Sequence, residues 1–282
     1  MNQFGGCVRQ SETFDFALLG IPYDEKSSFL KGTSGGPAAV RKHSSVEMIN
    51  AWTELGINLE EDCVVVDHGD LVIEGDYGQV SKNIQNGVKT ILDAGAVPVV
   101  LGGDHSVSYP VVRAAASAYG PLDILHFDAH PDLYDELYGD PFSHACPFRR
   151  ILEEGLAASL VQVGIRAFTG EHRKTAEKFG VRWVEMKDIP PLPELAFARP
   201  LYVSIDMDSL DPAFAPGVSH YEPGGLTTRQ LIQIIHRLRG DIICFDVVEV
   251  NPERDESGIT AAAAGKLAME VMGKILYERR KK

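Results

Sequence analysis

Acidic and imidazole side chains occur at every second position of one short stretch, Asp128-Ala129-His130-Pro131-Asp132, directly after an apolar run. Because alternate side chains of an extended chain share a face, Asp128, His130 and Asp132 are expected to point the same way. Two carboxylates and an imidazole that converge are costly to bury unless a positive charge lies among them. The stretch therefore indicates a metal site, with a polar turn after a strand as the alternative.

Residues of the same kinds follow three further apolar runs, at 97–101, 201–205 and 242–248. In α/β folds with parallel strands, functional side chains gather at the carboxyl ends of the strands. Four strand ends that carry acidic or imidazole groups therefore predict one shared site. The additional candidates, in chain order, are His105, Asp206, Asp208 and Glu249.

The predicted site contains two imidazoles and four carboxylates, which are more ligands than a four-coordinate structural zinc accepts. An oxygen-rich set suits Mn²⁺-like ions, and bridging carboxylates suit a pair of them. A metal-bound water is acidified to hydroxide, so the reaction class is hydrolysis at carbon or phosphorus. Glu249 is placed to bind a planar guanidinium through two parallel hydrogen bonds. The six candidate ligands are His105, Asp128, His130, Asp132, Asp206 and Asp208.

Eight short apolar, β-branched runs alternate with helix-period stretches along the whole chain. The runs are nearly continuous rather than alternating, as expected for strands covered on both faces. This order predicts crossover units and a parallel sheet, either open or closed into a barrel. No shift in composition marks a second domain, so we expect one domain over residues 1–282. The expected strands lie at 16–21, 63–67, 97–101, 122–128, 160–165, 181–184, 201–206 and 242–248, and the expected helices at 80–93, 107–119, 171–179, 227–238 and 260–277.

The formal net charge of the 282 residues is −13, which argues against nucleic acid or an anionic membrane as a partner. The same charge is compatible with a small cationic substrate. The four cysteines have no paired spacing, and the first residues lack the basic region and apolar run of a secretory signal. We therefore predict a cytoplasmic protein with reduced thiols.

Three blocks of sequence together resemble the signature motifs of the ureohydrolase family, which includes arginases and agmatinases. They are Gly-Gly-Asp-His-Ser (102–106), Asp-Ala-His-Pro-Asp (128–132) and Ser-Ile-Asp-Met-Asp-Ser-Leu-Asp-Pro (204–212), and the match extends over about residues 14–275. The resemblance implies an arginase-like three-layer α/β/α fold with an open, mostly parallel eight-stranded sheet. It also implies two Mn²⁺ ions per subunit, release of urea, and a homotrimer or homohexamer.

The resemblance assigns a role to each site residue. Asp132 would orient the hydroxide and later protonate the leaving amine. Glu249 would bind the guanidinium, and His144, in the loop Ser-His-Ala-Cys-Pro-Phe, would shuttle protons beside the substrate. For the metals, His105, Asp128, Asp132 and Asp206 would hold one Mn²⁺, and His130, Asp128, Asp206 and Asp208 the other, with Asp128 and Asp206 bridging.

The substrate is expected to be agmatine, converted to putrescine and urea by attack of a metal-bridging hydroxide on the guanidinium carbon. The loop 133–138 has no obvious set of groups for a carboxylate, and Phe-Arg-Arg at 148–150 is similar to agmatinases. Arginine, converted to ornithine and urea, is the alternative within the family, because the segments 143–145 and 217–223 resemble plant-type arginases. Arg149 or Arg150 would then bind the carboxylate if turned inward, and other guanidino compounds come third.

Two hypotheses outside the family are a single-zinc deacylase and a catalytically silent metal-binding subunit. Metal stoichiometry separates them from a ureohydrolase, although Ni²⁺ or Co²⁺ would fit similar ligands. Structural roles are predicted for four residues near the motifs: hydrogen bonding for Asp104, a turn for Asp211, a hydrogen-bonded core position for His126, and packing for Cys146. His43, His68, His172 and His236 are left outside the predicted site.

Overall fold

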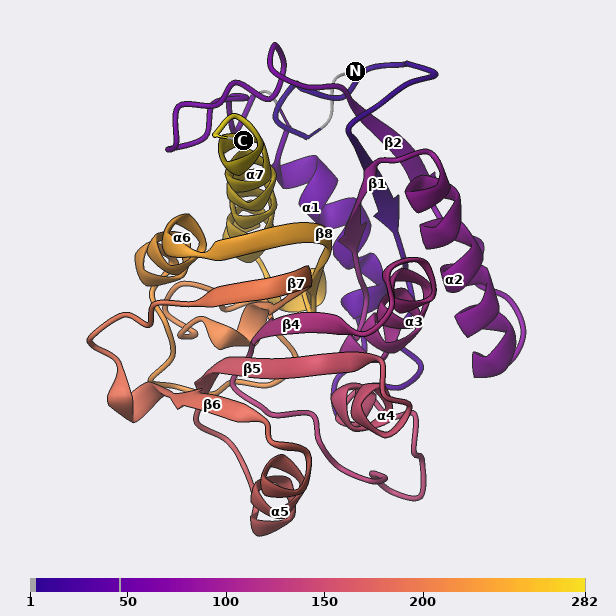
Figure 1. The fold of residues 1–282 in the computed structure, drawn as a ribbon, viewed down its shortest axis with the longest axis vertical. Helices are drawn as coiled ribbons and strands as arrows, with labels where there is room; N and C mark the ends of the chain where they lie inside the picture. Colours follow the sequence, from indigo (N-terminus) through magenta and orange to yellow (C-terminus); the bar gives the residue numbers. More distant parts are fainter. Residues whose placement is uncertain (1–3, 46, 282) are drawn as a thin grey trace.

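One eight-stranded sheet organises the chain, and the computed structural model describes its residues 4–45 and 47–281. The strand order is β2-β1-β3-β8-β7-β4-β5-β6, and every neighbouring pair is parallel (Figure 1). The sheet is open, so the predicted open α/β architecture is confirmed over the closed barrel. Each expected strand overlaps an observed one: β1 (Phe16–Gly20), β2 (Val65–Asp70), β3 (Val97–Leu101), β4 (Leu122–Phe127), β5 (Ala157–Ile165), β6 (Arg182–Glu185), β7 (Ala196–Asp206) and β8 (Arg239–Val248).

Helices cover both faces of the sheet and give it three layers (Figure 1). Alternate strand residues point to opposite faces, so Phe16 and Leu18 join one half of the core, and Ala17 and Leu19 join the other. Burial on both faces explains the continuous apolar runs in the sequence. The first face packs against α1 (Gly36–His43), α6 (Thr228–Arg237) and α7 (Ile259–Arg279), and the second against α2 (Tyr77–Asp93), α3 (Ser108–Tyr119), α4 (Pro147–Glu153) and α5 (Gly170–Phe179).

Apolar periodicity predicts five of these helices but neither α1 nor α4. Both are short, with eight and seven residues, and both have proline in the first turn. Two turns of helix show too few apolar repeats to be separated from a loop by period alone. Longer helices give a clear period, and their ends are fixed by caps: Asp76 accepts a hydrogen bond from the Gln79 amide at the start of α2.

The last strand, β8, lies between β3 and β7 in the middle of the sheet. The carboxyl ends of β3, β8, β7 and β4 are therefore four consecutive neighbours along one edge. This is the edge at which the polar residues follow the apolar runs. Within the described residues, no helix combines the length and the apolar character that a membrane crossing requires.

Candidate active site

The residues that follow the four central strands converge on one buried cluster. His105 begins a single 3-10 turn after β3, and the next groups come from the ends of β4 and β7. All six predicted metal ligands lie in this cluster, which we call the acidic cluster. They are His105, Asp128, His130, Asp132, Asp206 and Asp208; of these, only His130 exceeds one tenth side-chain exposure.

The imidazole of His105 faces three carboxylates. Its Nδ1 atom lies 3.2 Å from Asp128 Oδ2, 3.1 Å from Asp132 Oδ2 and 3.1 Å from Asp206 Oδ2. The Ser204 hydroxyl donates to Asp246, so it accepts from His105 Nε2–H, 2.9 Å away. In that tautomer Nδ1 presents a lone pair to the carboxylates.

The orientation of His105 tests whether a metal fits the acidic cluster. Within the described part of the chain, Nδ1 is buried and has no hydrogen-bond partner. A buried lone pair beside three carboxylate oxygens is unfavourable unless a cation lies among them. One imidazole nitrogen and three oxygens are suitable ligands for a divalent metal ion, and the residues therefore fit one.

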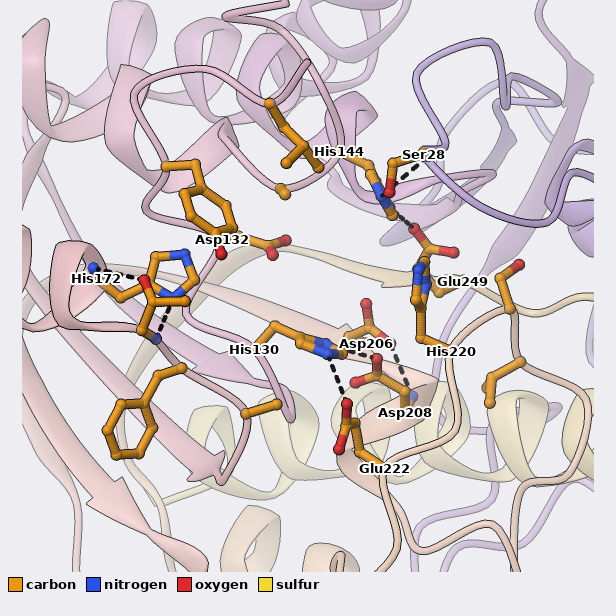
Figure 2. A pocket seen from close by; sticks show the side chains of 18 residues that line it. Ser28, His130, Asp132, His144, His172, Asp206, Asp208, His220, Glu222 and Glu249 are labelled. Carbon is orange, nitrogen blue, oxygen red and sulfur yellow. Dashed lines mark hydrogen bonds and ion pairs between the residues drawn. The ribbon is translucent and has the colours of Figure 1, made fainter.

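A second group of ligands shares Asp128 with the first. His130 Nδ1 lies 2.9 Å from Asp208 Oδ2 and 3.5 Å from Asp128 Oδ1. The two oxygens of Asp128 thus face different imidazoles, as a bridging carboxylate would. His130 points with Asp206 and Asp208 into the pocket, and its Nε2 is 3.5 Å from Glu222 Oε1 (Figure 2).

The acidic cluster carries more negative charge than its own histidines can balance. Burial raises the pKa of Asp206, and the neighbouring Asp208 and Asp128 raise it further. Burial and Asp128 likewise raise the pKa of Asp208. Two protonated imidazoles would leave four carboxylates two charges short of neutrality. Two divalent cations would balance all four carboxylates, which agrees with a binuclear centre.

Local backbone geometry supports the placement of these groups. Asp132 and Glu249 have positive φ values of 51° and 63°, a region that non-glycine residues rarely occupy. Such conformations cost about 1–3 kcal/mol each and concentrate at functional sites. At Gly103 a Cβ atom would lie 1.9 Å from the Tyr23 carbonyl oxygen, so only glycine permits this contact beside the site.

Glu249 and His144 lie next to each other on the pocket wall (Figure 2). Glu249 Oε1 accepts from the His105 amide at 3.0 Å and lies 3.0 Å from His144 Nδ1. Burial lowers the pKa of His144, but the hydrogen bond and charge of Glu249 raise it to about 9. The other nitrogen, Nε2, lies 2.8 Å from Ser28 Oγ and 3.2 Å from Ser28 N, so it can donate to the hydroxyl or accept from the amide.

A pocket of about 350 Å³ connects Glu249 to the acidic cluster, a volume suited to a small ligand. Among its described lining residues there is no lysine or arginine. Arg149 pairs with Glu153 at 2.6 Å, and Arg150 pairs with Asp135 at 2.6 Å. Neither arginine lines the pocket, so the inward orientation that carboxylate binding by one of them would require is not observed.

Sequence reasoning missed part of the pocket wall. Ser28 follows β1, and Phe168, Thr169 and His172 follow β5. The rule that function lies at carboxyl ends of strands could have pointed to both segments. Singly, however, a serine or threonine in a loop carries no signal, and His172 lies in the first turn of a helix, apart from the three motifs.

The predicted structural roles near the motifs are confirmed. Asp104 accepts from Lys26 N and Ser106 N, and Asp211 accepts from the amides of a turn. His126 is a buried, hydrogen-bonded residue of the core. Burial raises the pKa of the Cys146 thiol to about 12, which makes it a poor nucleophile.

Comparisons with known proteins agree with this geometry. The family model described as Arginase family matches residues 14–273. A mitochondrial arginase of Medicago truncatula is 45% identical over 98% of this chain and 85% of its own length. A mitochondrial agmatinase of Gallus gallus is 36% identical over 93% of this chain and 81% of its own. The solved structure of Medicago truncatula arginase superposes with a TM-score of 0.87, covering 93% of this chain and 87% of that one.

These similarities also correct the prediction of a cytoplasmic protein, which is wrong. Both the arginase and the agmatinase relatives are named as mitochondrial proteins. The prediction depended on unpaired cysteines and the lack of a secretory signal. Those features argue only against an oxidising compartment, and they do not distinguish the cytoplasm from an organelle with reduced thiols.

Proposed function

We propose that this chain, which belongs to the arginase family, hydrolyses L-arginine to L-ornithine and urea. The similarity to an arginase at 45% identity, against 36% for an agmatinase, supports arginine over agmatine. This order reverses the sequence prediction, which placed agmatine first. The coarser statement, that the chain is a metal-dependent guanidino-compound hydrolase, follows from its family.

The argument for agmatine considered too little of the pocket. It depended on the loop 133–138, whose side chains offer no clear site for a carboxylate. The wall also includes Ser28, Thr169 and Ser219, which come from segments far apart in sequence. Their hydroxyl groups can donate hydrogen bonds to a carboxylate without an arginine.

The observation that carries the proposal is the position of Glu249. Its carboxylate is buried and lines the same pocket as the acidic cluster. Within the described residues, its hydrogen bonds to the His105 amide and to His144 are made through Oε1, which leaves Oε2 for a cationic group. A guanidinium held there would place its central carbon toward the metal ligands.

We propose Mn²⁺ as the resident metal, with two ions per chain. His105, Asp128, Asp132 and Asp206 would hold one ion, and His130, Asp128, Asp206 and Asp208 the other. The chemistry that such a pair supplies when bound is the acidification of a water molecule, which gives a nucleophile near neutral pH.

Two side chains of the protein are placed to move protons around the substrate. Asp132 lies 3.1 Å from His105 Nδ1 and lines the pocket, where its carboxylate can orient a water and later protonate the leaving amine. His144 can exchange a proton between Glu249 on one side and Ser28 on the other.

Urea release from the Mn²⁺-loaded protein, with arginine and agmatine in parallel, tests the proposed substrate. We expect kcat/KM for arginine to exceed that for agmatine at least tenfold, equivalent to about 1.4 kcal/mol. The absence of lysine and arginine from the described pocket lining keeps agmatine as the second candidate. Preference for agmatine would overturn the choice of arginine and leave the guanidino-hydrolase assignment intact.

Metal counting in the same preparation tests the hypotheses outside the family. Two ions per chain with urea release support the proposal; one zinc would favour a deacylase, and bound metal without turnover a silent subunit. We further propose a homotrimer or homohexamer without nucleic acid or membrane as a partner. Sedimentation of the metal-loaded protein measures the first of these directly.

A further inference from the structure

We propose that Trp183, Gln162 and His126 form a hydrogen-bonded relay that holds the carboxylate of Asp128 in place and thereby raises the metal affinity of the acidic cluster. The relay lies behind the metal ligands, in the core of the sheet. The proposal depends on the metal centre and is independent of which guanidino substrate the enzyme prefers.

The relay runs from the edge strand β6 to the end of β4 through short contacts. Trp183 Nε1 lies 2.6 Å from Gln162 Oε1, and Gln162 Nε2 lies 2.9 Å from His126 Nδ1. His126 Nε2 lies 2.7 Å from Asp128 Oδ2. Gln162, His126 and Asp128 are all completely buried.

The direction of every proton in the relay follows from groups whose roles are fixed. An indole N–H can only donate, so Gln162 presents its oxygen to Trp183. The amide nitrogen then faces the Pro131 carbonyl oxygen, 2.6 Å away, which can only accept. The second hydrogen of the Gln162 amide points at His126 Nδ1, so this nitrogen must be unprotonated and accept the hydrogen bond. The His126 proton therefore lies on Nε2 and is donated to Asp128.

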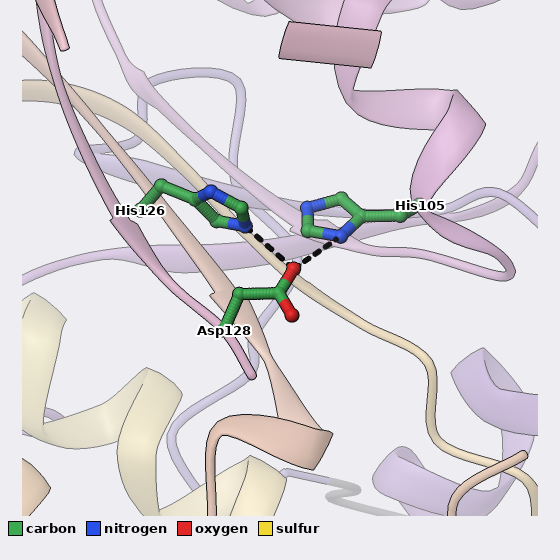
Figure 3. Close-up of side chains that lie close together, drawn as sticks. All are labelled: His105, His126 and Asp128. Atoms are coloured by element: carbon green, nitrogen blue, oxygen red, sulfur yellow. Dashed lines mark hydrogen bonds and ion pairs between the residues drawn. The ribbon is translucent and has the colours of Figure 1, made fainter. Parts of the chain in front are cut away.

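Packing holds the His126 ring in this orientation. Its ring stacks on Phe148 with centroids 3.9 Å apart and planes 23° apart, and it meets His105 edge-on at 4.9 Å. Figure 3 shows His126 and His105 approaching the same oxygen of Asp128 from two sides. His105 is the predicted metal ligand, and His126 is the hydrogen-bond donor.

This arrangement separates His126 from the metal ligands, although His105, His126 and Asp128 lie close enough to be counted as one metal-binding group. Both nitrogens of His126 are already in use, one as acceptor from Gln162 and one as donor to Asp128. Neither nitrogen is therefore available to an ion. Outer-shell partners of this kind orient ligands, and their loss typically weakens metal affinity about 10–100-fold.

The first test measures Mn²⁺ affinity of the metal-free protein by competition with a chelator. His126→Phe keeps the stacking on Phe148 but removes the donor, and we expect a 10–100-fold weaker affinity. His126→Gln restores an N–H near Nε2, and we expect affinity within about threefold of wild type. Circular dichroism of the metal-free variants confirms that each is folded before its affinity is compared.

Two further variants test how much each member of the relay contributes to Mn²⁺ affinity. Gln162→Leu removes the group that fixes the His126 tautomer, so its affinity should lie between those of His126→Phe and wild type. Trp183→Phe leaves the Pro131 carbonyl to orient Gln162, so its effect should be smaller than that of Gln162→Leu. If these residues had a purely structural role, all of these variants would instead change Mn²⁺ affinity by a similar factor.

Nitrogen NMR of the metal-free protein with labelled histidine gives a readout that does not use activity. The signal that disappears in His126→Phe should show a protonated Nε2 and an unprotonated Nδ1. The opposite tautomer, or wild-type Mn²⁺ affinity in folded His126→Phe, would overturn the relay. Loss of a whole metal equivalent in both His126→Phe and His126→Gln would also overturn it, since His126 would then be a ligand.

Discussion

In the described part of the chain, a second buried group of carboxylate and histidine differs from the acidic cluster in the source of its positive charge. The acidic cluster at the carboxyl ends of the central strands gathers four carboxylates around two imidazoles. The second group, which we call the Glu270 cluster, lies between α6 and α7. There a single buried carboxylate is bound by His236 Nε2 at 2.7 Å, Lys266 Nζ at 2.6 Å and the Glu54 amide at 3.0 Å.

The comparison shows how one set of residue types serves two purposes. In the Glu270 cluster the chain supplies its own cation, Lys266, so the carboxylate is paired as soon as α7 packs on α6. In the acidic cluster the chain supplies excess anions, and balance requires ions from solution. The first arrangement stabilises the fold. The second lowers the stability of the folded state until metal binds.

The largest expected effect tests the acidic cluster at its shared ligand. Asp128→Ala should remove at least one metal ion and reduce urea release by well over a hundredfold, beyond the usual loss for outer-shell residues. Because it also leaves the buried His126 N–H and the His130 amide without their acceptor, the metal-free variant should be less stable than metal-free wild type. Metal counting, urea release and chemical unfolding in chelator measure the three outcomes. A variant with two ions and normal turnover would contradict the assignment.

A smaller effect is expected from the carboxylate that binds substrate rather than metal. Glu249→Gln should keep both metal ions but lower kcat/KM on every guanidino substrate by at least about thirtyfold, equivalent to 2 kcal/mol for a lost buried charge pair. Steady-state kinetics beside metal counting tests it, with His144→Asn as the matched control for the neighbouring bond. Wild-type efficiency on all guanidino substrates would show that Glu249 does not bind the guanidinium.

The Glu270 cluster should respond to pH rather than to metal. Burial raises the pKa of Glu270, but its bonds to His236 and Lys266 lower it to about 2. A carboxylate whose folded pKa is lowered stabilises the fold above its unfolded pKa, near 4.3, and loses that contribution as pH falls toward 2. Glu270→Gln should therefore cost about 2–3 kcal/mol at pH 7 and much less at pH 3. Denaturant unfolding of both proteins at pH 7 and pH 3 measures this difference in the free energy of unfolding. An equal loss of stability at the two pH values would contradict the prediction.

The smallest effect should come from the partly exposed ion pairs of α4. Arg149 and Arg150 pair with Glu153 and Asp135 outside the pocket, and such pairs contribute about 0–1 kcal/mol. Arg149→Ala and Arg150→Ala should leave the metal count unchanged and KM for arginine within about threefold. A larger rise in KM for arginine than for agmatine would show that one of them binds the substrate carboxylate after all.

Sequence reasoning predicted the strands and the acidic cluster because both have local signals. Apolar runs mark buried strands, and Asp128, His130 and Asp132 share a face by simple alternation. The short helices α1 and α4 and the pocket wall at Ser28 and Thr169 have no such signal. They acquire a role only when segments far apart in sequence meet. The preference for agmatine, which the relatives support less than arginine, had this weakness, because one loop was taken for the whole wall.

The position of β8 has a consequence for how the protein is made. Strands β1 to β3 form one side of the sheet and β4 to β7 the other, and β8 joins them through β3 and β7. During synthesis the two sides emerge from the ribosome first and cannot pair with each other until β8 follows. We expect a slow final step of assembly, since non-local parallel pairing is intrinsically slow. Glu249 leaves the ribosome directly after β8, so a nascent chain can acquire no activity until its sheet is nearly complete.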